Sequence, residues 1–123
     1  MMVEKILKTR EDICAYVRER YGAELEYLWV KTPGNGVFRH NHNRKWFAAI
    51  VDITEDKLGL DGKEPIDALL LKCGPELKTL LIDHVSVFPA YHMNREHWIT
   101  VRLGIENPKI QEMIDFSYNL TKV

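Results

Sequence analysis

Apolar side chains recur at helical spacing near both ends of the chain. Thr9 precedes a first turn rich in acidic residues, an arrangement that favours the start of a helix, and Gly22 follows the last apolar position. The apolar positions between them are Ile13, Tyr16, Val17 and Tyr21. After Asn107-Pro108, a second stripe with the spacing i, i+3, i+4, i+7, i+8 consists of Ile110, Met113, Ile114, Ser117 and Tyr118. These patterns predict one helix over Arg10–Tyr21 and another with Asn107 as its cap and Pro108 in its first turn.

Short apolar runs separated by turn-forming residues predict strands in the first half of the chain. The cluster Pro33-Gly34-Asn35-Gly36 interrupts the chain, and strand-forming residues follow at Val37–His40 and Lys45–Ile53. The intervening Asn41–Arg44 is polar and tolerates left-handed backbone, as a tight turn requires. We expect these two strands to form a hairpin, preceded by an extended segment at Leu25–Lys31.

Loop, strand and helix signals alternate in the middle of the chain. Thr54–Pro65 is polar and predicts a loop, and Asp67–Lys72 predicts a strand. Gly74-Pro75 stops this strand and begins a helix that should end near Asp83, because proline is favourable at the first helical position. The expected apolar face of this helix consists of Leu77, Leu80 and Leu81.

An alternating strand at Trp98–Leu103, after an extended segment at Val85–Phe88, completes the predicted elements. Side chains of a strand point alternately to opposite faces. The residues expected to face the core are Ile99, Val101 and Leu103, and those expected on the other face are Trp98, Thr100 and Arg102. The order of the elements predicts an α+β fold, a two-layer sandwich whose antiparallel sheet is covered by helices on one face.

Composition and charge narrow the class of protein. The 123 residues are 46% hydrophobic, which suits one domain over residues 1–123. A formal net charge of -1 excludes the strongly basic balance typical of many nucleic-acid-binding proteins, although local patches can differ. No apolar run is long enough to cross a bilayer or to act as an export signal, which favours a cytoplasmic protein with no membrane contact. Cys14 and Cys73 lack C-x-x-C spacing and are expected to be apolar fillers, with neither a disulfide nor a zinc site.

Four segments resemble the MmcQ/YjbR family. They are Lys45–Ala48, Leu71–Leu77, Tyr91–Trp98 and Asp115–Leu120. The resemblance extends over most of the chain from the first helix onward, and the Tyr-His-Met-Asn loop with its following His-Trp is its most specific part. It implies a CyaY-like fold and DNA binding through a double-wing arrangement of hairpins. Similarity to frataxin-like folds does not imply iron handling, because function resides in sites and not in folds.

The residues themselves allow a DNA-binding interpretation of the hairpin. No acidic residue lies between Glu26 and Asp52, so the hairpin is locally cationic and can lie along a phosphate backbone. The candidate DNA-binding residues are Arg39, His42, Arg44, Lys45, Arg95 and Arg102. The competing interpretation is that these charges only keep a turn solvated and protect a sheet edge. We expect non-catalytic binding to DNA, with the hairpin as the main contact.

The loop before the last strand is the alternative candidate site. A small-ligand or enzymatic site there would use Lys72, Tyr91, His92, Asn94, His97 and Trp98. No nucleophile with an adjacent base and no glycine-rich phosphate loop accompanies them, so the expectation is a loop that satisfies its own polar groups, with Arg95 pointing outward. A further alternative is a protein-interaction module anchored by an exposed Trp46 or Trp98.

A metal site and a cofactor are not expected. His40 and His42 are two residues apart on a strand, a spacing that can chelate a metal, but no carboxylate or cysteine near them completes a ligand set. We therefore predict no metal ligand and no bound cofactor.

Overall fold

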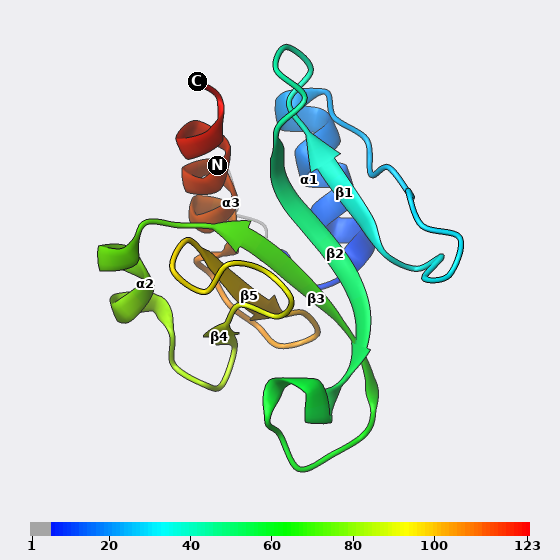
Figure 1. Ribbon diagram of the computed structural model, residues 1–123, viewed down its shortest axis with the longest axis vertical. Coiled ribbons are helices and arrows are strands. Elements are labelled where there is room, and N and C mark those ends of the chain that lie inside the picture. Colours follow the sequence, from blue (N-terminus) through cyan, green and yellow to red (C-terminus); the bar gives the residue numbers. More distant parts are fainter. Residues whose placement is uncertain (1–5) are drawn as a thin grey trace.

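The computed structural model describes residues 6–123, which form a five-stranded sheet with helices on one side (Figure 1). The elements in chain order are α1 (Arg10–Tyr21), β1 (Gly36–Arg39), β2 (Trp46–Thr54), the 3-10 helix η1 (Glu55–Leu58), β3 (Pro65–Lys72), α2 (Pro75–Leu81), β4 (Val87–Pro89), β5 (Trp98–Arg102) and α3 (Ile110–Thr121). The strand order is β1-β2-β3-β5-β4, and every neighbouring pair is antiparallel. No helix within residues 6–123 has the length and apolar character that crossing a membrane requires.

One face of the sheet and the helices enclose the main hydrophobic core. Helices α1 and α3 lie behind the sheet in Figure 1 and bury their apolar stripes against it. The largest fully buried side chains of this core include Ile13, Phe38, Phe47, Ile50, Leu69, Leu71, Ile99 and Ile114. Side chains of α2 border the same core through Leu77 and Leu81. The predicted α+β two-layer sandwich is confirmed.

Helix α1 begins and ends as the sequence predicts. The Thr9 hydroxyl accepts a hydrogen bond from the Asp12 N–H, and the Asp12 carboxylate accepts one from the Thr9 N–H, which together form a capping box. At the other end Gly22 adopts left-handed backbone with φ 67°, and its N–H donates to the Arg18 carbonyl.

Ser117 joins α3 to two strands of the sheet. Its hydroxyl donates to the Phe47 carbonyl at 2.5 Å and accepts the Lys72 N–H at 2.9 Å. The residue is fully buried. A serine on the apolar stripe of α3 therefore fixes the helix to β2 and β3 by polar contacts inside the core.

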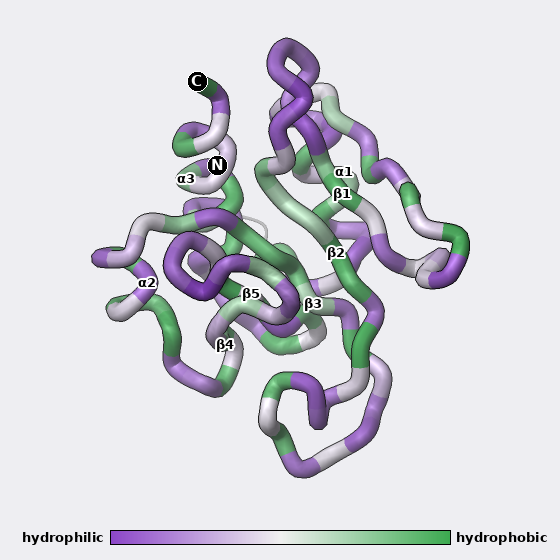
Figure 2. Tube along the Cα trace, viewed as in Figure 1, coloured by the Kyte–Doolittle hydropathy of each residue, from purple (hydrophilic) through white to green (hydrophobic). Residues whose placement is uncertain are grey.

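On the opposite face of the sheet, here called the outer face, no helix of residues 6–123 packs. Val37, Ala49 and Leu70 form a second buried cluster there, and the loop that leads into β5 packs on it through Tyr91 and Met93. Figure 1 shows this loop, in yellow, lying in front of the sheet. Figure 2 shows that the tip of the β1–β2 hairpin and much of the loop are hydrophilic stretches next to the hydrophobic strands.

Three details of the predicted elements were wrong. Only Glu26 of the segment Leu25–Lys31 pairs with a strand, through one antiparallel bridge to Val37, and the rest of the segment is irregular. Leu80 is 82% exposed and does not lie on the same side of α2 as Leu77 and Leu81, which pack against the core. The strand expected at Val85–Phe88 begins two residues later, because the Asp83 carboxylate accepts backbone hydrogen bonds from residues 85–87 and holds them in a turn.

Candidate functional site

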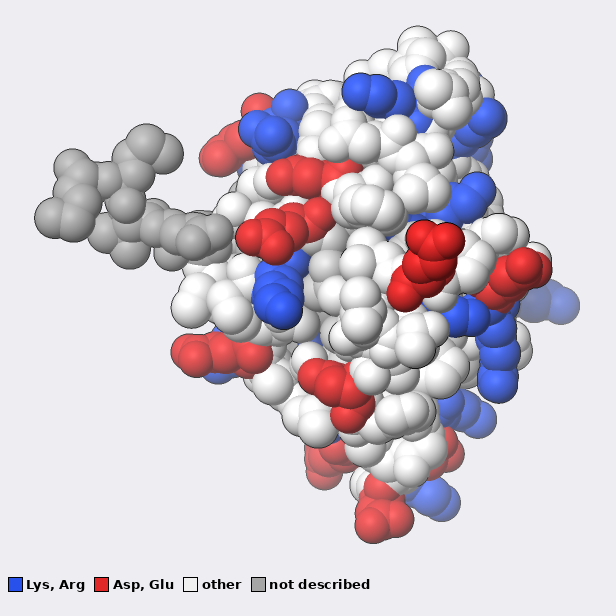
Figure 3. All heavy atoms as spheres, turned by 90° about the vertical axis from the view of Figure 1, so that its left-hand side faces the viewer, with Lys and Arg blue, Asp and Glu red and all other residues white. Residues whose placement is uncertain are grey.

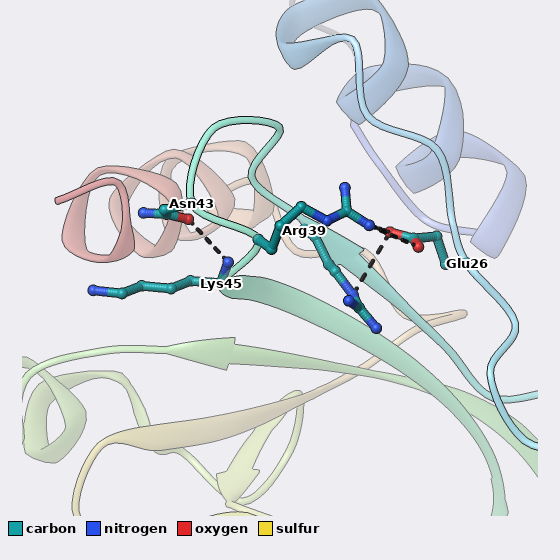
Figure 4. Close-up of polar contacts among 5 residues, drawn as sticks. Glu26, Arg39, Asn43 and Lys45 are labelled. Carbon is teal, nitrogen blue, oxygen red and sulfur yellow. Dashed lines mark hydrogen bonds and ion pairs between the residues drawn. The ribbon is translucent and has the colours of Figure 1, made fainter.

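The arginines of the predicted DNA-binding hairpin share one carboxylate. Arg44 Nη2 donates to Glu26 Oε1 at 3.1 Å, and Arg39 Nε lies 3.7 Å from Glu26 Oε2 (Figure 4). Glu26 reaches both because it bridges to the edge strand β1. The carboxylate therefore offsets part of the positive charge that the sequence places at this hairpin.

The polar tip of the hairpin contacts the C-terminal end of α3. His42 Nε2 donates to the Lys122 carbonyl at 2.6 Å, and Lys45 Nζ donates to the Val123 oxygen at 2.6 Å. Asn43 adds a bond from Nδ2 to the Thr121 carbonyl, while its Oδ1 accepts the Lys45 N–H (Figure 4). These side chains fasten the hairpin to the helix, a structural role that sequence inspection did not predict.

His40 is a core residue. Its side chain is 1% exposed, and Nε2 lies 2.7 Å from Thr121 Oγ1. Its ring packs 4.3 Å from the Tyr118 ring, centre to centre. Burial lowers the pKa of His40, and the neighbouring His42 acts in the same direction. Within residues 6–123, no group of three or more histidine, cysteine or acidic side chains is placed to hold a metal ion.

The buried His40 predicts a loss of stability in mild acid. Because its pKa is lower in the folded state than the ordinary 6.5, the unfolded chain takes up a proton that the folded chain does not. The free energy of unfolding should therefore fall as the pH drops from about 6.5 toward the lowered value. Urea denaturation between about pH 7.5 and 5.5 measures this, and His40→Gln should flatten the dependence.

The control for this prediction is a histidine that is exposed. His84 has φ 57°, a left-handed conformation that asparagine tolerates, so His84→Asn removes an exposed imidazole with little strain. This variant should keep the acid sensitivity of the parent. An unchanged pH dependence in His40→Gln would contradict the assignment to His40.

The remaining two candidate DNA-binding residues lie away from the hairpin. Arg102 Nη2 forms an ion pair with Glu55 Oε2 at 2.7 Å, and both side chains are largely buried. Arg95 lies in the loop before β5, is exposed, and makes no side-chain hydrogen bond or ion pair in the part of the chain that the structure describes. The six predicted residues therefore do not converge on one surface.

The loop before β5 bonds part of its own backbone, as predicted, through Asn94. Asn94 Oδ1 accepts the Glu96 N–H at 2.8 Å, and the Asn94 carbonyl accepts the N–H groups of His97 and Trp98. The Tyr91 N–H donates to Thr100 Oγ1 at 2.9 Å. This network fixes the loop against the outer face of the sheet.

An aromatic hollow of about 320 Å³ opens on the outer face, between this loop and the segment before β1. Its walls include Trp29, Trp46 and Tyr91, and its floor includes Ala49 and Leu70. The rings of Trp29 and Trp46 meet edge to face with centres 5.8 Å apart, and Trp29 remains 40% exposed. Such a surface suits a flat, apolar group. We call it the aromatic hollow.

The hollow uses only part of the predicted ligand site. Tyr91 and His92 line it, whereas Lys72, Asn94, His97 and Trp98 do not. Trp29 was missed, because it lies in a segment without periodicity and nothing in the sequence indicates which way its ring faces. Trp46, proposed from sequence as an exposed anchor, is half-buried and forms one wall.

Basic side chains favour the side of the molecule that carries this hollow. Figure 3 is turned so that the face seen in Figure 1 lies along its right-hand side, and most Lys and Arg side chains in view gather toward that side. Asp and Glu side chains are spread across the view and reach the opposite side. The charges are mixed, and the molecule does not divide into one purely basic and one purely acidic half.

Comparison with known proteins shows to which family the chain belongs. The family model described as YjbR matches residues 18–120. The chain belongs to the YjbR family. The match includes the hairpin, the loop before β5 and most of α3, so both candidate surfaces lie within the family region.

Two relatives support this placement in the YjbR family. YyaQ of Bacillus subtilis is 43% identical over 116 residues, covering 93% of this chain and 98% of that protein. YjbR of Escherichia coli K12 is 36% identical over 99 residues, covering 76% and 80%. Both are named uncharacterized proteins.

The solved structures agree with the fold. A crystal structure of a Pseudomonas syringae protein superposes with a TM-score of 0.88 at 38% identity, covering 93% of this chain and 99% of that one. A Deinococcus radiodurans protein, DR2400, has a TM-score of 0.71 at 23% identity over 96% of this chain and 81% of its own. This second similarity concerns the fold alone.

Proposed function

We propose that this YjbR-family protein binds single-stranded nucleic acid on the outer face of its sheet, with a base inserted in the aromatic hollow. The observation that supports this most strongly is the set of aromatic walls formed by Trp29, Trp46 and Tyr91 on the face without helices. Every nucleobase offers a flat π surface, and base–aromatic stacking contributes about 1–3 kcal/mol per base. A hollow of about 320 Å³ is at the small end of ligand sites, which suits one base at a time.

The charge distribution supports a weak, salt-sensitive interaction. The net charge of -1 provides little long-range attraction to a polyanion. Arg39 lies on the same face of the sheet as Trp46, since the two residues pair in the β1–β2 register, and Arg44 shares the Glu26 contact of Arg39. Their shared contact with Glu26 leaves them partly neutralised, so they add to affinity without dominating it.

A single strand fits this surface better than a duplex. In a duplex the bases are stacked on one another, so their faces cannot enter a recessed aromatic hollow without being unstacked. Duplex binding through the hairpin would instead depend on Arg39, Arg44 and Lys45, which already contact Glu26 and the end of α3. Binding of a duplex through the hairpin, here called the hairpin mode, is therefore the alternative that a binding experiment must distinguish.

Fluorescence polarisation with a labelled oligonucleotide of about twelve nucleotides tests the proposal. We expect a dissociation constant on the order of 10⁻⁴ to 10⁻⁶ M for the single strand at low salt, and weaker binding of the matching duplex. The logarithm of the affinity should fall linearly with the logarithm of the salt concentration. Absence of binding to the single strand at low salt would refute the proposal, and tighter binding of the duplex would favour the hairpin mode.

A further inference from the structure

A second hollow lies beside the aromatic one and shares a wall with it. It has a volume of about 460 Å³, and its lining includes Lys57, Gly59, Pro89 and Arg95. Tyr91 and His92 line both hollows, so these two residues form the border between them. We call this second space the cationic hollow.

The cations of this hollow come from two segments that are distant in sequence. Lys57 belongs to η1, and Arg95 belongs to the loop before β5. Both are exposed, and neither forms an ion pair or a side-chain hydrogen bond within residues 6–123. Folding thus brings positive charges from two distant segments to one concave surface.

The other arginines proposed for DNA binding behave differently. Arg39 and Arg44 contact Glu26, and Arg102 contacts Glu55. Two carboxylates lie next in sequence to these cations. Asp56 accepts a hydrogen bond from the Thr54 hydroxyl, and Glu96 lies 3.9 Å from His97. Neither acidic residue lines the hollow.

The border between the hollows has left-handed backbone. His92 has φ 55°, a conformation that few residues other than glycine adopt, although histidine, asparagine and aspartate adopt it more often than the rest. Its ring packs edge to face on Tyr91 with centres 4.1 Å apart, and the side chain remains exposed. Conformations of this kind are often held in place at functional sites. Here the loop network keeps His92 between an aromatic surface and a cationic one.

We infer that the cationic hollow binds the phosphate of a nucleotide whose base occupies the aromatic hollow. This inference rests on the proposed function and adds a ligand class, a base joined to a phosphate. Lys57 and Arg95 supply charge and hydrogen-bond donors from two directions, and the arginine fork matches phosphate oxygens. The nucleotide spans the Tyr91–His92 border.

Nucleotide titrations followed by ¹⁵N NMR test the inference. The probes are thymidine, thymidine 5′-monophosphate and inorganic phosphate. Thymidine 5′-monophosphate should bind about tenfold more tightly than thymidine. This ratio corresponds to about 1.4 kcal/mol, which one charge-assisted hydrogen bond to the phosphate can supply. Arg95→Ala and Lys57→Ala should each reduce this ratio and leave the affinity for thymidine unchanged. Two exposed cations elsewhere serve as controls, Arg18→Ala and Lys109→Ala, and should preserve the ratio.

The outcomes separate this inference from the proposed function. Equal binding of thymidine and its monophosphate, or a ratio unaffected by Arg95→Ala and Lys57→Ala, overturns the phosphate site while base stacking stands. If thymidine does not bind but inorganic phosphate shifts the amide signals of Lys57, His92 and Arg95, the anion site stands and base stacking fails. If no probe shifts these signals or those of Trp29 and Trp46, both are refuted.

Discussion

Replacing Ser117 with alanine should lower the free energy of unfolding by about 2–4 kcal/mol. The hydroxyl is fully buried and serves two backbone groups on different strands, donating to the Phe47 carbonyl and accepting from the Lys72 N–H. Alanine leaves both groups in the core without this partner, and an unsatisfied buried polar group costs about 1–3 kcal/mol. The expected loss is a large share of the stability of a chain of this size.

Urea denaturation measures this loss, and the control is a variant that lacks a hydroxyl with little effect on the free energy of unfolding. Thr79 lies on α2, is exposed, and makes only a 3.4 Å bond to the Pro75 carbonyl within its own helix. Thr79→Ala should change the free energy of unfolding by less than about 0.5 kcal/mol. A loss below about 1 kcal/mol in Ser117→Ala would mean that the two backbone groups find other partners.

Trp29→Ala should weaken binding of a single-stranded oligonucleotide by about tenfold or more. The indole forms one wall of the aromatic hollow, and removing one stacking surface costs about 1–3 kcal/mol. Trp29 lies outside the strands and helices, in the irregular segment before β1, so the substitution should leave the fold intact. Fluorescence polarisation gives the affinity, and the circular dichroism spectrum verifies the fold.

Phe116 provides the matched control. Its side chain is 40% exposed, the same fraction as that of Trp29, but it belongs to α3 on the opposite side of the sheet. Phe116→Ala removes a comparable exposed aromatic ring and should leave the affinity unchanged. Equal losses in the two variants would contradict binding at the outer face.

The fold could be predicted where local pattern and packing agree. Thr9 and Gly22 delimit α1, and the alternation of Trp98–Leu103 gives the correct faces of β5, because capping and strand periodicity depend on near neighbours in sequence. Leu80 was misplaced because α2 has only seven residues, too few for its apolar spacing to define a face. Asp83 shifted the start of β4 through side-chain bonds that no periodicity reveals.

The candidate site was harder to predict because it depends on contacts between distant segments. The hairpin is basic in sequence, yet Glu26 partly neutralises it from 13 and 18 residues away. Arg102 pairs with Glu55, 47 positions earlier. Lys57 and Arg95 differ from these arginines, because neither forms an ion pair within residues 6–123, and their sequence neighbourhoods do not reveal this.

The family motifs have identifiable structural roles in this chain. In Asp115–Leu120 the Asp115 carboxylate accepts hydrogen bonds from the hydroxyls of Tyr16 and Tyr21, which fastens α3 to α1. Burial and this carboxylate together raise the pKa of Tyr16 to about 12. The loop Tyr91–Trp98 is both a self-bonded structure and the border of the two hollows.

Mapping a single-stranded oligonucleotide onto the protein by ¹⁵N NMR is the most direct test of binding at the outer face. We expect the largest shifts at Trp29, Trp46, Tyr91 and Met93, with smaller ones at the hairpin arginines. The indole N–H signals of Trp29 and Trp46 report on the hollow itself. Shifts confined to residues 41–45 at the hairpin tip, or to α3, would contradict a binding site on the outer face.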